Sequence, residues 1–122
     1  MLLNSFFHIL KEERAENSAQ FTIKLNAEHP IFQGHFPGYP ITPGVCVTQM
    51  AVDLFSHIFQ QKFMIKKAKN IKFINILKPD ETDTCDYQLS WEAVDGQEYR
   101  IKAIVNQGDT IYAKMDLTLR NE

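Results

Sequence analysis

The sequence predicts an α+β fold in which an antiparallel sheet wraps around one long central helix. Apolar and polar residues alternate in several runs, which is typical of strands with one buried face. Between these runs, Val45 to Phe59 is apolar around most of its circumference, which is typical of a helix enclosed by other structure. Both patterns are satisfied most simply if the sheet encloses the helix.

A hairpin is predicted at the start of the chain. Phe6 to Glu13 and Gln20 to Asn26 flank a polar turn at Glu16-Asn17-Ser18. The second run alternates, so that Phe21, Ile23 and Leu25 share one side. We expect that side to be buried.

A loop dense in glycine and proline follows, from Glu28 to Pro43. Such a composition predicts an irregular but conformationally fixed segment, which is a natural place for a functional site. Thr42 then offers an N-cap hydroxyl and Pro43 a proline suited to a first helical position, so we expect the helix to begin there. Gln49, Asp53, Ser56 and Gln60 form one narrow polar stripe along this helix.

The remainder of the chain predicts three or four long antiparallel strands. After a lysine-rich connection, Asn70 to Leu77 is an apolar run ended by Lys78-Pro79-Asp80, and Thr84 to Ala93 alternates strictly. Turns at Asp95-Gly96 and at residues 107–109 separate two more alternating runs, which end near Leu119.

Length and charge limit the classes of function. The 122 residues suffice for one domain spanning 1–122, and 13 Lys+Arg against 15 Asp+Glu give a net charge of −2. This balance argues against a general nucleic-acid binder. Cys46 and Cys85 stand apart without metal-ligand spacing, so we expect reduced thiols, no metal and a cytoplasmic protein. Residues 1–10 lack a basic leader and are broken by polar residues, so we expect neither a signal peptide nor a membrane span.

The segment from Gly34 to Gly44 carries a specific resemblance. Its pattern, Gly-His-Phe-Pro-Gly-x-Pro-x-x-Pro-Gly, resembles at every defined position the active-site loop of the (3R)-hydroxyacyl-acyl carrier protein dehydratases. Residues 72–80 resemble, more loosely, a later strand of that family. The resemblance implies the hotdog fold, in which a dimer forms one continuous sheet and places two active sites at the interface. The dimer could be formed with a second copy or with a different hotdog subunit.

The resemblance also implies residue roles. Removing water from a 3-hydroxyacyl thioester needs a base, a donor to the thioester oxygen and an acid for the departing hydroxyl. His35 matches the family's base, and the backbone N–H groups of Gly44 and Val45 at the helix N-terminus match the oxygen donors. The loop or tunnel lining corresponds to Phe36, Pro37, Gly38 and Pro43. No cofactor is implied, because the substrate is carried on the phosphopantetheine of acyl carrier protein.

One position departs from the family pattern. The family's acid is a helix carboxylate fourteen residues after the histidine, contributed by the other subunit, and Gln49 stands there. An amide can form a hydrogen bond to a hydroxyl but cannot deliver a proton. Since general acid–base steps contribute about 10² to 10⁴ in rate, a site that pairs His35 only with Gln49 is expected to be strongly impaired.

Three interpretations of this departure remain open. In the first, Asp53, one turn beyond Gln49, replaces the acid. In the second, a different hotdog subunit supplies the carboxylate. In the third, the protein binds acyl thioesters or the carrier without catalysing elimination. Each residue also has a structural alternative to a role in catalysis. Gln49 would lie in the dimer interface, and Asp53 would be a solvated residue of the polar stripe. A thioesterase on the same fold is the least favoured function.

A cluster of lysines lies between the helix and the later strands. Five lysines occur within residues 62–72 of an otherwise acidic chain. They indicate either a solvated connection or a docking surface for an acidic carrier protein, with Lys66, Lys67 and Lys69 as its centre.

Overall fold

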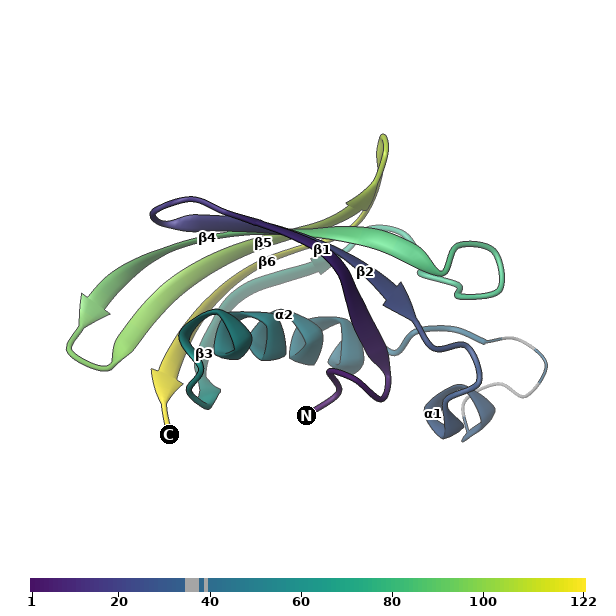
Figure 1. Cartoon of the computed structure of the whole chain (residues 1–122), viewed down its shortest axis with the longest axis horizontal. Helices are drawn as coiled ribbons and strands as arrows, with labels where there is room; N and C mark the ends of the chain where they lie inside the picture. The colour runs from purple at the N-terminus through teal and green to yellow at the C-terminus, as the bar shows by residue number, and fades with distance from the viewer. Residues whose placement is uncertain (35–37, 39) are drawn as a thin grey trace.

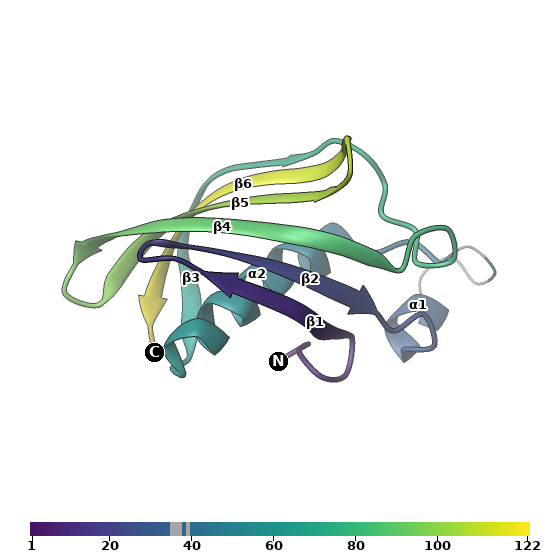
Figure 2. The same ribbon diagram turned by 45° about the horizontal axis from the view of Figure 1, so that its top comes forward.

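Six antiparallel strands form one curved sheet that covers one side of a long helix (Figure 1). The computed structural model describes residues 1–34, 38 and 40–122. The strand order is β1-β2-β4-β5-β6-β3, so that β1 and β3 lie at the two edges (Figure 2). The elements are β1 (Phe7–Arg14), β2 (Ser18–Leu25), α1 (Pro30–Gly34), α2 (Gly44–Phe59), β3 (Phe63–Phe73), β4 (Thr84–Asp95), β5 (Glu98–Gln107) and β6 (Thr110–Asn121). The predicted arrangement of a sheet around a central helix is confirmed.

The alternating runs become strands whose apolar side chains face α2. In β2, Phe21, Ile23 and Leu25 are all buried, as expected. Near the middle of the sheet, the buried Tyr87 hydroxyl donates a hydrogen bond to the carbonyl of Val47 at 2.8 Å. This bond gives the buried Tyr87 hydroxyl a hydrogen-bond partner and links α2 directly to β4.

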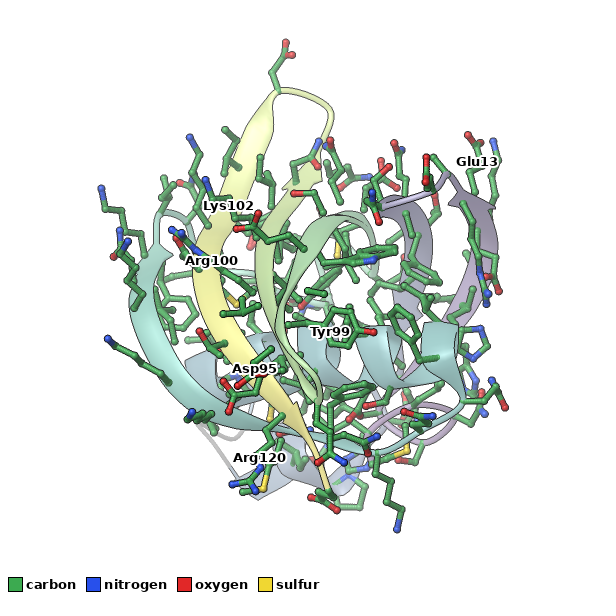
Figure 3. All side chains as sticks on the ribbon, turned by 90° about the vertical axis from the view of Figure 1, so that its left-hand side faces the viewer. Glu13, Asp95, Tyr99, Arg100, Lys102 and Arg120 are labelled. Carbon is green, nitrogen blue, oxygen red and sulfur yellow. The ribbon has the colours of Figure 1, made fainter. Side chains whose placement is uncertain are left out.

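Aromatic rings hold the far end of the helix against the sheet. The ring of Phe55 lies 4.8 to 5.6 Å, centroid to centroid, from those of Phe59, Phe63, Trp91 and Tyr99. Three of these contacts are edge-on, which is a favourable geometry for aromatic pairs. Figure 3 labels Tyr99, whose ring comes from β5 into this cluster. The C-terminal half of α2 is thereby anchored independently of the predicted active-site loop.

The start of α2 differs from the prediction. The helix begins at Gly44 and its N-cap is Pro43, with no side-chain cap hydrogen bond. The prediction that Thr42 provides the cap was wrong, because the helix begins one residue later than expected. The backbone N–H of Thr42 bonds to the carbonyl of Leu77 at 2.9 Å. Its buried hydroxyl has no partner among the described residues.

The lysine-rich segment is a strand, which corrects the predicted connection. Residues 63–73 form β3, and the apolar run predicted as a strand over 70–77 leaves the sheet after Phe73. β3 pairs with β6 at an edge of the sheet, and its register shifts twice. Lysines and bulges are common devices for protecting an edge strand, so the composition that suggested a connection suits this position. The helix α1 likewise lies within the predicted irregular loop.

A charged cluster ties β1 to the end of α2. The carboxylate of Glu12 lies 3.0 Å from Nε2 of His57 and 2.7 Å from Nε of Arg14. Arg14 also donates to the carbonyl of Ile58 at 3.4 Å. The hydrogen bond to His57, assisted by Arg14, lowers the pKa of Glu12 despite opposition from partial burial.

We expect Glu12→Gln to lower the free energy of unfolding at neutral pH by a few tenths of a kcal/mol to about 1 kcal/mol, as for other partly exposed ion pairs. Because the folded state lowers the pKa of Glu12, its contribution is present above the ordinary Glu value of about 4.3. It is lost as the pH falls through the folded pKa. Urea titrations of both proteins from neutral to acid pH measure the difference, and a constant difference across that range would contradict the assignment.

Candidate active site

The loop that carries the family motif is described in part. His35, Phe36 and Pro37 lie outside the described residues, so their assignment as base and tunnel wall stays a prediction. Gly38 has a φ of +83°, a backbone conformation that favours glycine. At this position the motif therefore has a conformational reason for its residue type.

Both ends of the loop are held by contacts with the rest of the fold. Before the loop, Phe32 of α1 is 2% exposed, and its ring stacks on that of Phe6 with centroids 4.8 Å apart. After the loop, the Thr42 N–H bonds to Leu77, which is itself buried. These contacts hold α1 and residues 40–43, the described residues on either side of Gly38, against the rest of the fold.

The helix N-terminus offers two backbone donors. The N–H groups of Cys46 and Val47 donate to the carbonyl of Pro43 at 2.9 and 3.0 Å. Those of Gly44 and Val45 have no partner within the described part of the chain. At the start of a helix, such groups and the helix dipole favour negative charge on a nearby oxygen. This geometry suits the predicted role of Gly44 and Val45.

Gly44 also permits a close approach to the edge strand. A Cβ atom built on Gly44 would lie 2.8 Å from the ring of Phe73 in β3. Since ordinary Cβ contacts are longer, a larger residue would displace this ring. Gly44 therefore allows the first turn of α2 to lie directly beneath the end of β3.

Gln49 and Asp53 are joined by a hydrogen bond. Nε2 of Gln49 donates to Oδ1 of Asp53 at 2.9 Å, across one turn of α2. Asp53 is 1% exposed, so the expectation that its carboxylate could be solvated was wrong. The polar stripe predicted from the sequence is thus partly enclosed.

The N-terminal segment encloses the Asp53 carboxylate. Oδ2 of Asp53 accepts the backbone N–H groups of Leu2 at 2.6 Å and Leu3 at 3.3 Å. This segment lies on the side of α2 that faces away from the sheet (Figure 1). Both carboxylate oxygens are therefore occupied by donors. No pattern in the sequence pointed to these partners, because they are backbone groups 51 and 50 residues away along the chain.

The predicted docking lysines lie together on the edge strand, away from Gln49 and Asp53 in the sequence and on a different element. Lys66 is paired with Glu98, with Nζ 2.6 Å from Oε2. Lys67 and Lys69 are exposed and form no salt bridge within the described residues. These two are therefore the freer cations of the predicted group.

Neighbouring strands add charges that the sequence analysis did not assign. Arg100 of β5 forms two hydrogen bonds to Asp116 of β6, at 3.0 and 2.8 Å. These bonds lower the pKa of Asp116, and the charges of Lys69 and Lys102 act in the same direction. Arg100 and Lys102 are labelled in Figure 3. The strand pairing thus brings Lys69 of β3 and Lys102 of β5 near the same carboxylate of β6, a relation that the sequence alone did not reveal.

The described residues contain no group of three or more His, Cys, Asp or Glu that could hold a metal ion. Cys46 and Cys85 are buried free thiols, and burial raises the pKa of Cys85 to about 12. No described helix is both long and apolar enough to cross a membrane.

Comparison with known families places the motif in context. A profile of the ApeI-like family, described as ApeI dehydratase, matches residues 11–115. The 3-hydroxyacyl-acyl-carrier-protein dehydratase FabZ of Aliarcobacter butzleri is 32% identical over 78 residues, which are 54% of this chain and 52% of that protein. The FabZ of Fusobacterium nucleatum is 27% identical over 105 residues, 78% of this chain and 73% of that protein. The chain thus spans about half the length of the first relative.

Solved structures share the fold. The Dehydratase Heterocomplex ApeI:P from Xenorhabdus doucetiae contains a chain that matches with a TM-score of 0.72 at 18% identity, over 92% of this chain and 96% of that chain. A hypothetical thioesterase with coenzyme A from Streptococcus pneumoniae matches with a TM-score of 0.63 at 11% identity, over 98% and 90%. The predicted hotdog fold is confirmed by these matches, which at such identities show the fold alone.

Proposed function

The chain belongs to the ApeI-like dehydratase family, and we propose that it acts on (3R)-hydroxyacyl thioesters of acyl carrier protein in a site completed by a different hotdog subunit. The observation that carries this proposal is Gln49 at the position of the family's acid, hydrogen-bonded to an enclosed Asp53. In this site, the chain supplies the base and the oxygen donors, and the partner supplies the carboxylate.

The elimination divides between the two subunits as follows. His35 takes the proton from the carbon beside the thioester carbonyl, and the N–H groups of Gly44 and Val45 stabilise the negative charge that develops on the thioester oxygen. The hydroxyl at C3 leaves with a proton from the partner's carboxylic acid. The products are water and a 2-enoyl thioester. The family resemblance assigns Phe36, Pro37, Gly38 and Pro43 to the lining of the acyl chain's path.

The surroundings of Asp53 argue against its use as the acid. Its carboxylate is buried and accepts three N–H donors, so it must leave Leu2, Leu3 and Gln49 before it can hold a proton for a substrate hydroxyl. Each lost bond to a charged group would cost about 1.5 to 3 kcal/mol. A carboxylate that enters from another subunit avoids this cost.

An exposed apolar region offers a place for the second subunit. Val45 is 76% exposed at the start of α2, and Phe73, Ile74 and Ile76 are 54%, 49% and 59% exposed at and beyond the end of β3. β3 is also an edge strand with one free side. A second hotdog subunit that continues the sheet here would cover the apolar groups and lie beside Gly44, which supports a site at this junction.

A non-catalytic subunit that binds acyl thioesters or the carrier is the second candidate. The same Gln49–Asp53 bond supports it, because an amide retains a hydroxyl ligand without protonating it. A thioesterase has the weakest support, since the similar hypothetical thioesterase shares the fold at only 11% identity.

The double variant Gln49→Glu with Asp53→Gln tests whether only the acid is missing. It places one carboxylate at position 49 and lets the amide at 53 donate to it, so we expect dehydration by the purified chain alone to rise by about 10² to 10⁴. Gln49→Glu alone is expected to gain less, because two carboxylates within hydrogen-bond distance repel one another. Conversion of 3-hydroxyacyl to 2-enoyl thioester is followed by absorbance.

Asp53→Gln alone serves as the matched control and is expected to stay inactive. Efficient dehydration by the unmodified chain alone would contradict the need for a partner. A silent double variant, together with a wild-type chain that binds 3-hydroxyacyl thioesters, would favour the binding subunit.

Docking of the carrier is tested by reversing Lys67 and Lys69 to Glu. If these lysines meet an acidic carrier, we expect carrier-linked binding or turnover to slow by about tenfold at low salt, with a smaller effect at high salt. Pantetheine thioesters, which lack the carrier protein, should be handled at the wild-type level. Lys11→Glu on β1 is the matched control, and an equal loss with both kinds of substrate would contradict the docking surface.

A further inference from the structure

The buried carboxylate of Asp53 decides which way the Gln49 amide faces. An ionised carboxylate can only accept hydrogen bonds, so the Gln49 atom next to Oδ1 must be the donor Nε2. The observed distance between Nε2 and Oδ1 is 2.9 Å. The reverse orientation would place two oxygens against each other in a buried position. Asp53 thus leaves the Gln49 carbonyl oxygen, Oε1, on the other side.

The N-terminal segment keeps the carboxylate in this orientation. Leu2 and Leu3 bind Oδ2, so Oδ1 remains for Gln49 and the carboxylate cannot rotate without losing bonds on both sides. The segment itself is fixed, because the N–H of Phe6 bonds to the carbonyl of Leu2 at 2.8 Å and Phe6 is fully buried. The orientation of the amide is therefore built into the fold.

The Oε1 atom of Gln49 is available to a ligand. Gln49 is half-buried, and among the described residues no donor binds its Oε1. An accessible acceptor with a fixed direction selects a ligand group that can donate a hydrogen bond.

We propose that Asp53 is a positioning residue that fixes Gln49 with its acceptor toward the acyl ligand, so that the chain prefers thioesters with a hydroxyl at C3. This inference rests on the proposed function in one respect: in a hotdog dimer, the acid position that Gln49 occupies faces the acyl ligand bound beside the other subunit's loop. A 3-oxo group has no hydrogen to donate, so its oxygen and Oε1 would be two acceptors facing each other. A saturated chain leaves Oε1 unpaired.

Equilibrium binding of three pantetheine thioesters tests the proposal: 3-hydroxyoctanoyl, 3-oxooctanoyl and octanoyl. For the wild-type chain we expect the 3-hydroxy compound to bind about tenfold more tightly than the 3-oxo compound. Failure to bind any of the three overturns this inference, whereas the proposed function fails only if the chain together with a partner subunit converts no 3-hydroxyacyl thioester. Binding without preference for the 3-hydroxy compound overturns the inference alone.

Asp53→Asn separates a positioning role from a merely structural one. The amide introduced at position 53 can accept from Leu2 and Leu3 through its oxygen while its nitrogen donates to Gln49, which must then turn its own Nε2 toward the ligand. We expect the preference to reverse in favour of the 3-oxo compound. A variant that folds and binds but keeps the wild-type preference would overturn the inference.

Two further variants complete the test, whether or not Asp53→Asn folds. Gln49→Ala leaves the bonds from Leu2 and Leu3 to Asp53 in place and should remove the preference for the 3-hydroxy compound, while amide exchange at Leu2 and Leu3 stays slow. Retention of the preference in Gln49→Ala overturns the inference. Asp86→Asn alters a carboxylate that accepts the Thr22 hydroxyl at 2.7 Å between β2 and β4, and as the matched control it should bind all three compounds like the wild type.

Discussion

The buried carboxylate of Asp53 on the central helix requires hydrogen-bond donors, and several features of this chain provide them. Asp53 is 1% exposed, and burying an ionised group without partners would cost several kcal/mol. Leu2 and Leu3 supply two donors from the start of the chain, and Gln49 supplies a third from one turn earlier in α2. The path of the N-terminal segment, its packing on the open side of the helix and the direction of the Gln49 amide all depend on this one group.

The same segment connects the helix to the loop that carries the family motif. Phe6 follows Leu2 and Leu3 and stacks on Phe32 of α1, directly before the loop. The interactions that satisfy Asp53 therefore also support one end of the loop, and the bond from Thr42 to Leu77 supports the other. A fold that uses its helix carboxylate in this structural way has none left at position 49 for proton transfer, which is the physical basis for proposing that another subunit provides it.

Local patterns predicted the architecture well, and long-range contacts account for the failures. Alternation and an apolar helix sufficed for the sheet around α2, because both depend on burying one face of each element. The lysines of residues 62–72 led to the prediction of a connection where the structure has the edge strand β3. Composition alone does not show that a lysine-rich segment pairs with a sheet on one side only. The Thr42 cap failed because the helix starts one residue later, with Pro43 as its N-cap. The prediction of a solvated Asp53 failed because backbone groups of residues 2–3, far away in the sequence, enclose its carboxylate. In the site, the motif identified the position of Gln49, but its bond to Asp53 emerged only from the structure.

In the proposed assembly, this chain supplies half of an active site whose carboxylate comes from a different subunit. A complementation assay tests it most directly: the purified chain is mixed with a FabZ-type hotdog dehydratase whose loop histidine has been replaced by alanine but whose helix carboxylate is intact. Each protein alone should be inactive on a 3-hydroxyacyl-carrier substrate. We expect the mixture to dehydrate the substrate, and this activity to disappear when His35 of this chain is replaced by alanine. A mixed dimer that forms but remains inactive would contradict the claim.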